Sequence, residues 1–341
     1  MHQFCCEEDA LAVVVKDATL AQHYGEDFCV LSYQKLNTPF SAVYKLLCKA
    51  TDRTFTLYLK TLCQHSIPEK AMLGLKSEFE IMRQLNQLFA DSSRLNVPNP
   101  VKFYPETLSL LTEEVVGSEL ETLFSGAALL IRRAPLKKAL EMAELAGMWL
   151  KQFQLMTKNS DMAVSHIALA DYCQERLDYL IAKQVPGFTK NMTDQLYGMA
   201  EMADRQVFPE QIFYCGCHGD FAPHNIITDR QNLSVLDFTD YRLDINLFDP
   251  INFMEKVGRM HGYFRYRHAV VEQLNHHFLQ GYGLLSEDVV DSASYRLIRA
   301  RCVLLRLFNI VVSDEKYSPQ KRYNSKMYSE SLAEFNNLID C

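Results

Sequence analysis

The chain has 341 residues, of which 48% are apolar and 23% are charged, and this composition excludes an intrinsically disordered protein. Because a single hydrophobic core seldom grows to this size, we expect two lobes. The net charge of -7 argues against nonspecific nucleic-acid binding as the main activity. Neither length nor composition fixes the oligomeric state.

Targeting and metal-binding patterns are also weak. Residues 1–8 contain neither a basic nor an apolar targeting segment, and no later window approaches the roughly 18 apolar residues of a membrane span. We therefore expect a soluble, cytoplasmic protein with no integral membrane segment. The ten cysteines lack the rhythm of a disulfide scaffold. The one close pair of interest, Cys215 and Cys217, is interpreted as strand packing rather than a metal site.

Alternating and helical apolar patterns predict a first lobe over residues 1–115, built on an antiparallel meander with a helix packed on it. A shorter helix precedes the meander and ends at Tyr24-Gly25. The predicted elements are a helix over about 8–23, strands over 28–36, 42–49 and 54–62, a helix over 68–89, and strands over 101–104 and 108–115.

The pattern changes at Gly117, and residues 116–341 are expected to form a larger, mainly helical lobe. One compact island of short strands interrupts it. The predicted elements are helices over 134–156, 167–183 and 194–204 and strands over 211–217, 225–228 and 233–238.

The strand island carries side chains that phosphoryl transfer can use. It reads His218-Gly219-Asp220-Phe221-Ala222-Pro223-His224-Asn225, followed by Val235-Leu236-Asp237-Phe238. One carboxylate must receive the acceptor hydroxyl, while an amide oxygen and a second carboxylate hold magnesium against the ATP phosphates. The spacing is that of the kinase loop H-R-D-x-x-x-x-N followed by D-F-G, with Gly219 and Thr239 replacing Arg and the final Gly.

This stretch resembles the aminoglycoside phosphotransferase and choline kinase-like family, whose loop reads roughly H-G-D-x-x-x-x-N. The resemblance extends over about 28–285 and is strongest in 211–240. It implies a two-lobed, protein-kinase-like α+β fold that uses ATP and Mg²⁺. It also implies that Asp220 is the catalytic carboxylate and that Asn225 and Asp237 are metal ligands, with His218 supporting the loop.

Upstream residues resemble the nucleotide-binding parts of the same family in the same order. Lys60 corresponds to the lysine that reaches the nucleotide phosphates, and Glu78 to its ion-pair partner, with Glu80 as a competitor. Main-chain groups of about Glu113 to Val115 would bind adenine. Ser41, in the turn over 37–41, would lie near the phosphates.

One further pair of residues extends the family pattern, and three positions depart from it. Asp249-Pro250 resembles the family pair that caps a helix and braces the site, but Phe253 stands where a further Asp is usual. Ala222 and His224 replace the histidine and glycine of the commoner loop. These departures leave the subfamily open.

The sequence therefore predicts an ATP- and Mg²⁺-dependent kinase that phosphorylates a hydroxyl of a small molecule. The acceptor is left open among an antibiotic, a sugar or cell-envelope saccharide, and an amino alcohol, as is the choice between ATP and GTP. The alternatives are a protein kinase, although no activation segment ending in A-P-E is present, and a non-catalytic pseudokinase.

Residues 259–268 are dense in cationic and aromatic side chains. They are either a solvated helix face or, if they face the cleft, a surface suited to an anionic or sugar-like acceptor. Arg296, Arg299 and Arg306 are interpreted as the edge of a packed helix.

Overall fold

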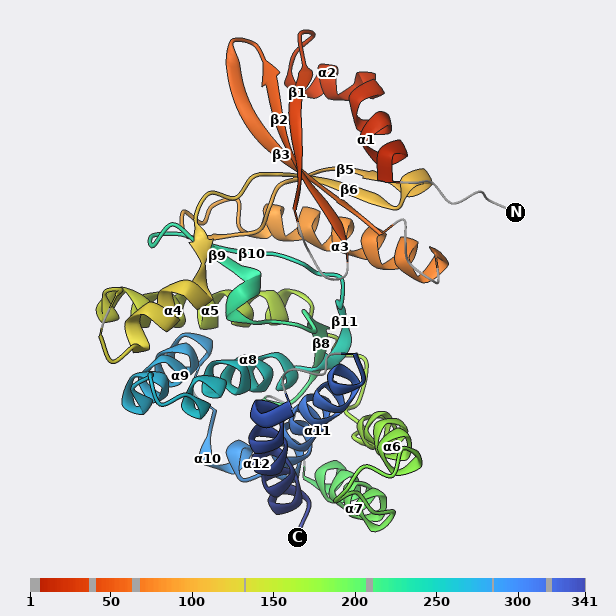
Figure 1. Ribbon diagram of the computed structural model, residues 1–341, viewed down its shortest axis with the longest axis vertical. Coiled ribbons are helices and arrows are strands. Elements are labelled where there is room, and N and C mark those ends of the chain that lie inside the picture. The colour runs from red at the N-terminus through yellow and green to blue at the C-terminus, as the bar shows by residue number, and fades with distance from the viewer. Residues whose placement is uncertain are drawn as a thin grey trace. The chain divides into compact units, whose positions relative to one another are not determined.

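The computed structural model describes residues 7–36, 41–62, 68–131, 133–206, 211–283, 285–316 and 321–340. The chain forms two compact units, one comprising Met1–Thr122 and His224–Tyr241 and the other Leu123–Pro223 and Arg242–Cys341. An antiparallel-sheet unit and a mainly helical unit confirm the predicted α+β fold class (Figure 1). The lobe boundary between residues 115 and 116 stays a prediction.

The first unit is built on a five-stranded antiparallel sheet in the order β1-β2-β3-β6-β5. A small second sheet, in the order β4-β10-β9-β7, joins residues that are far apart in the sequence. The strands are β1 (Cys29–Leu36), β2 (Ala42–Ala50), β3 (Arg53–Thr61), β4 (Leu95–Asn96), β5 (Pro100–Tyr104), β6 (Ser109–Glu113), β7 (Ser118–Glu119), β9 (Ile226–Thr228) and β10 (Leu233–Val235).

The helices α1 (Glu7–Lys16), α2 (Ala18–Tyr24) and α3 (Pro68–Leu88) and the short turn η1 (Pro105–Thr107) complete this unit. The single helix expected over 8–23 is divided at Asp17, whose carboxylate caps α2 by accepting from the Thr19 amide at 2.9 Å. Burial alone would raise the pKa of Asp17. Hydrogen bonds from Lys102, Thr19 and Tyr104 outweigh it and lower this pKa to about 2.

The second unit is a helical assembly around a two-stranded antiparallel sheet of β8 (Tyr214–Cys217) and β11 (Arg242–Ile245). The helix α4 (Leu120–Ala128) begins in the first unit and ends in this one. The remaining elements are α5 (Leu136–Met156), α6 (Ile167–Ala182), α7 (Asn191–Arg205), η2 (Pro223–Asn225), α8 (Phe248–Gly258), η3 (Arg259–Gly262), α9 (His268–Tyr282), α10 (Glu287–Val290), α11 (Ala293–Lys316) and α12 (Lys321–Ile339).

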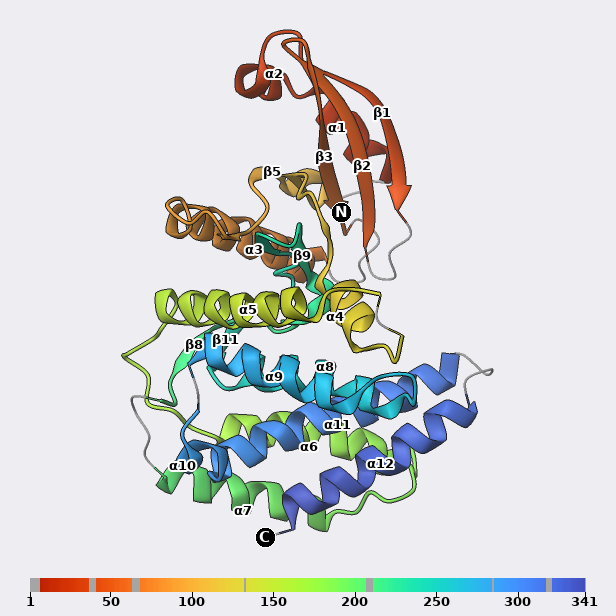
Figure 2. The same cartoon turned by 90° about the vertical axis from the view of Figure 1, so that its left-hand side faces the viewer.

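Two glycines let α5 and α9 approach closely, and Figure 2 shows these helices side by side. A Cβ atom at Gly281 would overlap the Glu144 carbonyl, and one at Gly147 would overlap the Phe278 carbonyl. Any larger residue would therefore push the helices apart. None of the described helices is both long and apolar enough to cross a bilayer.

Candidate active site

Lys60 is positioned by the two-residue alternation of β3. Leu57 and Leu59 are fully buried in a core that they share with Ala10 and Val14 of α1. Successive side chains of a strand point to opposite faces, so Lys60 emerges on the other face of the sheet. There it meets α3, which contacts the neighbouring strands β5 and β6.

Glu78 reaches Lys60 because it lies on the buried stripe of α3, in register with Leu75, Met82 and Leu85. The Lys60 Nζ lies 3.1 Å and 3.0 Å from the two Glu78 carboxylate oxygens. Glu80 is exposed and lies 3.9 Å from Lys76 instead. Of the two candidate carboxylates on α3, the structure places Glu78 against the lysine.

Asp237 joins the same cluster. Its carboxylate lies 2.6 Å from the Lys60 Nζ, while half of its side chain stays exposed. Its backbone has φ +63°, in the left-handed region that few residues other than glycine adopt. Such a conformation persists only where the surroundings enforce it, and it is common at functional sites.

Asn225 is held next to Asp237 by the β9–β10 hairpin. Ile226 pairs with Val235, and the Leu236 amide donates to the Asn225 carbonyl at 2.8 Å. The hairpin therefore brings Asn225 and Asp237, an amide residue and a half-exposed carboxylate residue, to the same end of its two strands. These hard oxygen donors fit Mg²⁺, which proteins commonly bind through one or two carboxylates plus the phosphates of a substrate.

Thr239 is a member of this cluster that the sequence did not single out. Its hydroxyl lies 2.5 Å from the Lys60 Nζ and 2.6 Å from the Asp237 carboxylate. It also donates to Glu78 at 3.3 Å. The only available signal was its position two residues after Asp237, where the kinase pattern expects glycine.

The cluster keeps the lysine charged. Burial alone would lower the pKa of Lys60, but the Glu78 and Asp237 carboxylates outweigh it, and the net result is a raised pKa. The three N–H donors of Lys60 are already directed at Glu78, Asp237 and Thr239, so an anion from solvent would bind the lysine by replacing an exposed acceptor, Asp237 or Thr239.

The segment predicted to bind adenine lies at the end of β6. The Glu113 amide donates to the Asn99 carbonyl at 2.9 Å, and its carboxylate accepts from the Tyr24 hydroxyl at 3.0 Å. Val115 follows outside the strand, and within the described residues its amide makes no backbone hydrogen bond. Ser41 lies just before β2, while residues 37–40 of its predicted turn lie outside the described residues.

The loop that carries Asp220 belongs to the second unit, and hydrogen bonds to the Asp249 carboxylate hold it in place. The Asp249 carboxylate is fully buried and accepts from the His218 amide at 2.7 Å and the Gly219 amide at 3.0 Å. Burial raises the pKa of this carboxyl, although His218 and the two amides oppose the rise. Gly219 has φ +85°, which suits the sharp bend after β8.

Phe221 anchors the other side of Asp220. It is fully buried and stacks on Trp149 of α5, with ring centroids 5.7 Å apart and an interplanar angle of 16°. It also contacts Phe253 of α8, with centroids 5.5 Å apart. The usual acidic position of the family pattern is thus occupied here by a core ring that supports the loop. Asp220 itself remains partly exposed.

Lys256 of α8 forms an ion pair with the Asp220 carboxylate, and sequence reasoning missed it. The lysine side chain is only 16% exposed, and that of Asp220 is 35% exposed. A single lysine in an amphipathic helix gives no sequence signal of this contact. The pair fixes the direction of the carboxylate that the sequence predicts to be catalytic.

Cys215 and Cys217 are both fully buried in β8, and burial raises the pKa of the Cys217 thiol. Their sulfur atoms lie 4.0 Å apart within the core of the second unit. Among the described residues, no group of three or more His, Cys, Asp or Glu side chains could hold a metal.

Comparison with known proteins gives one family match. The model of the phosphotransferase enzyme family matches residues 7–293. No curated protein matches the sequence.

Three solved structures with similar folds span almost the whole chain. An ethanolamine kinase from Plasmodium vivax has a TM-score of 0.61 at 12% identity, covering 97% of this chain and 90% of its own. A choline/ethanolamine kinase family protein from Mesorhizobium loti has a TM-score of 0.55 at 13% identity, covering 97% of both chains. A thermostable mutant of the aminoglycoside phosphotransferase APH(4)-Ia, in complex with ADP and hygromycin B, has a TM-score of 0.52 at 13% identity. This match covers 96% of this chain and 98% of the other.

Proposed function

Because the chain belongs to the phosphotransferase enzyme family, we propose that it is an ATP- and Mg²⁺-dependent kinase acting on a hydroxyl of a small molecule. The observation that carries this proposal is the cluster of Lys60, Glu78 and Asp237, which holds a charged lysine beside a carboxylate open to solvent.

We assign the nucleotide to the first unit. Lys60, held by Glu78, contacts the ATP phosphates, and main-chain groups from Glu113 to Val115 contact adenine. Asn225 and Asp237 hold Mg²⁺, which neutralises phosphate charge when bound. Ser41 remains the proposed contact from the turn before β2.

Asp220 is the proposed base. It accepts a hydrogen bond from the acceptor hydroxyl, whose oxygen forms the new bond to the γ-phosphorus while the bond to the bridging oxygen of ADP breaks. The hydroxyl proton passes to the Asp220 carboxylate late in the reaction, since a loose transition state needs positioning more than a strong base. Lys256 keeps that carboxylate oriented until the acceptor arrives.

Two rival functions make different predictions. A protein kinase would transfer labelled phosphate to a protein, and a non-catalytic module would bind nucleotide without consuming it. Similar folds that are named as ethanolamine, choline and aminoglycoside kinases favour a small acceptor, but their identity is too low to transfer a substrate.

The experiment is a coupled assay of ADP release by the purified chain with ATP and Mg²⁺. The panel contains aminoglycosides, macrolides, amino alcohols, sugars, sugar acids and sugar phosphates. We expect at least one compound to raise ADP release above the basal rate and to carry the phosphoryl group by mass spectrometry. Chelating the metal with EDTA should remove that activity, and added Mg²⁺ should restore it. Label found only on protein, or no ADP release with any compound, would contradict the proposal.

A further inference from the structure

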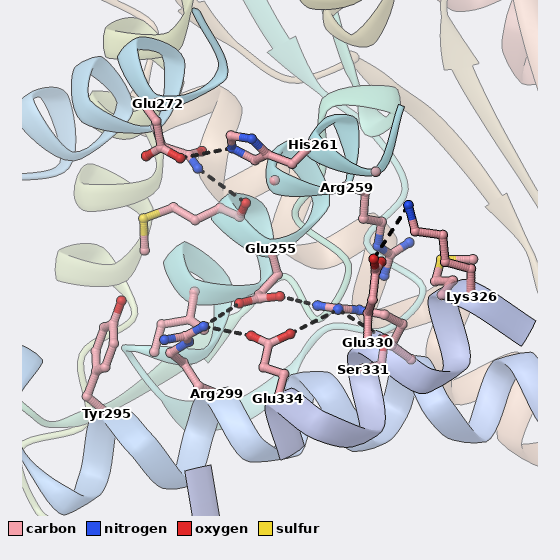
Figure 3. Close-up of a pocket in the computed structure, with 17 residues that line it drawn as sticks. Glu255, Arg259, His261, Glu272, Tyr295, Arg299, Lys326, Glu330, Ser331 and Glu334 are labelled. Atoms are coloured by element: carbon pink, nitrogen blue, oxygen red, sulfur yellow. Dashed lines mark hydrogen bonds and ion pairs between the residues drawn. The ribbon is translucent and has the colours of Figure 1, made fainter. Parts of the chain in front are cut away.

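A pocket of 440 Å³ lies in the second unit, among α8, η3, α9, α11 and α12. Its volume suits a molecule of monosaccharide or amino-acid size. Figure 3 shows its labelled side chains pointing toward one another from these elements. The charged and imidazole groups in its lining are Glu255, Arg259, His261, Glu272, Arg299, Arg306, Lys326, Glu330 and Glu334.

Two arginines and two glutamates in the lining form a network of ion pairs, in which each arginine contacts both glutamates. Arg299 lies 3.5 Å from Glu255 and 2.7 Å from Glu334. Arg306 pairs with Glu255 and lies 3.2 Å from Glu334. At this edge of α11, Arg299 and Arg306 join the helix to α8 and α12. Because the network holds two positive and two negative groups in four ion pairs, it shapes the pocket without favouring either sign of ligand charge.

The two remaining glutamates of the lining are also paired. Glu272 lies 2.9 Å from His261, and Glu330 lies 3.7 Å from Lys326. Arg259 differs from all of these groups. Among residues whose side chains are described, it takes part in no ion pair, although it lines the pocket and is exposed. The cation left to meet a ligand is therefore Arg259.

The electrostatic surroundings of Arg259 favour an incoming anion. Although part of the side chain is exposed, desolvation of the guanidinium and the positive charge of Arg306 lower its pKa, while Glu255 and Asp220 partly oppose this. An anion bound here would relieve the repulsion between the two arginines. A planar guanidinium can hold a carboxylate or phosphate through two parallel hydrogen bonds.

The same helix connects this cation to the proposed base. Lys256, which pairs with Asp220, and Arg259 are three positions apart at the end of α8 and the start of η3. Residues at that spacing are neighbours on a helix surface, separated by a rise of about 4.5 Å. The Asp220 carboxylate also acts electrostatically on the Arg259 guanidinium, so the two groups lie near each other although Asp220 does not line the pocket. An acceptor whose charge is held at Arg259 can direct its hydroxyl toward Asp220.

We infer that this pocket binds the phosphate acceptor and that the acceptor carries a carboxylate or a phosphate, which Arg259 holds. The inference rests on the proposed function for calling the ligand an acceptor. It specifies hydroxylated acids or sugar phosphates of about three to six carbons, the size that suits a pocket of 440 Å³. Cationic amino alcohols and aminoglycosides are disfavoured by the same arginine.

The test is binding, measured by thermal melting of the full chain in saturating MgADP, which prevents phosphate compounds from entering the nucleotide site. The probes form matched sets: glycerol, glycerate and glycerol 3-phosphate; glucose, glucuronate and glucose 6-phosphate; and the cations ethanolamine and choline. We expect at least one anion to raise the melting temperature by about 2–4 °C, and its neutral counterpart to raise it less.

The variants are Arg259→Gln and the control Arg265→Gln. Arg265 is exposed on the same segment and stacks on Tyr263 and Tyr266, but it does not line the pocket. Arg259→Gln should weaken binding of the active anion roughly tenfold to a hundredfold, and Arg265→Gln should leave it unchanged. Folding of both variants is checked by their melting without ligand.

The inference is overturned if no anion exceeds its neutral counterpart, if a cation gives the largest shift, or if the two variants behave alike. These failures are separate from failure of the proposed function. If only neutral or cationic acceptors were phosphorylated, the chain would still be a kinase, but the proposed anion site would be wrong. A melting-temperature shift that depends on Arg259, without phosphoryl transfer to any compound, would support the anion site but would show that its ligand is not the phosphate acceptor.

Discussion

Replacing Asp220 by asparagine is expected to lower turnover by about 10²- to 10⁴-fold, the range usual for removing a positioned acid–base group. The amide keeps the size of the side chain but cannot accept the hydroxyl proton. Nucleotide binding should remain, because the groups assigned to ATP belong to the first unit whereas Asp220 belongs to the second. Single-turnover assays and titration with a fluorescent ADP analogue separate the two effects.

The matched control is Asp291→Asn, an exposed carboxylate that follows α10 and lies outside the assigned groups. It should leave turnover unchanged. If Asp220→Asn retained the wild-type rate in a folded protein, Asp220 would not be the base, and the roles given to Lys256 and Asp249 around it would lose their reason.

Glu78→Gln is expected to lower kcat/KM for ATP by about 10²-fold, because a displacement of roughly 1 Å in a positioning group can have that effect. The change removes the buried charge that orients Lys60. It also weakens the acceptor for the Phe238 amide, which lies 3.2 Å away, and so loosens the backbone next to Asp237. Loss of a charged hydrogen-bond acceptor should also destabilise the fold by about 1–3 kcal/mol.

The comparison variant is Glu80→Gln on the same helix. Glu80 is exposed, and a surface pair such as its contact with Lys76 contributes roughly 0–1 kcal/mol. Steady-state kinetics and urea unfolding should therefore differ little from wild type. Equal losses in the two variants would mean that the position of Glu78 against Lys60 has no bearing on nucleotide use.

Sequence periodicity predicted most of the first unit because its strands and α3 follow strict apolar patterns. The strands β1, β2 and β3 and the helix α3 lie within one residue of the predicted ranges. The buried stripe of α3 also pointed to Glu78 rather than Glu80. Local pattern sufficed here because the side-chain direction on a strand or helix follows from spacing alone.

Short elements escaped prediction because tertiary contacts create them. The strands β4 and β7 have two residues each and exist only by pairing with the β9–β10 hairpin. The break at Asp17 depends on a hydrogen-bond network with distant residues. The segment 259–268 is no single helix either, since η3 ends at Gly262 and α9 begins at His268.

The residues of the candidate site also fall into two groups, those that the sequence predicted and those that only tertiary packing reveals. Motif spacing predicted roles for Asp220, Asn225 and Asp237 because the chemistry fixes the separation of such residues along the chain. Lys256 carried no sequence signal, and Arg259 was marked only as part of the cationic and aromatic segment 259–268. Their significance depends on which side of α8 meets the Asp220 loop, and tertiary packing decides that.

The central claim is that Lys60, Asn225 and Asp237 bind the metal and triphosphate on which Asp220 acts. The most direct measurement is a crystal structure of the chain with AMP-PNP and Mn²⁺, using anomalous scattering to locate the metal. We predict a manganese peak bonded to the Asn225 amide oxygen and the Asp237 carboxylate, with Lys60 on the phosphates and the γ-phosphate facing Asp220. A manganese peak bound to other residues, or ordered nucleotide away from Lys60, would contradict the claim.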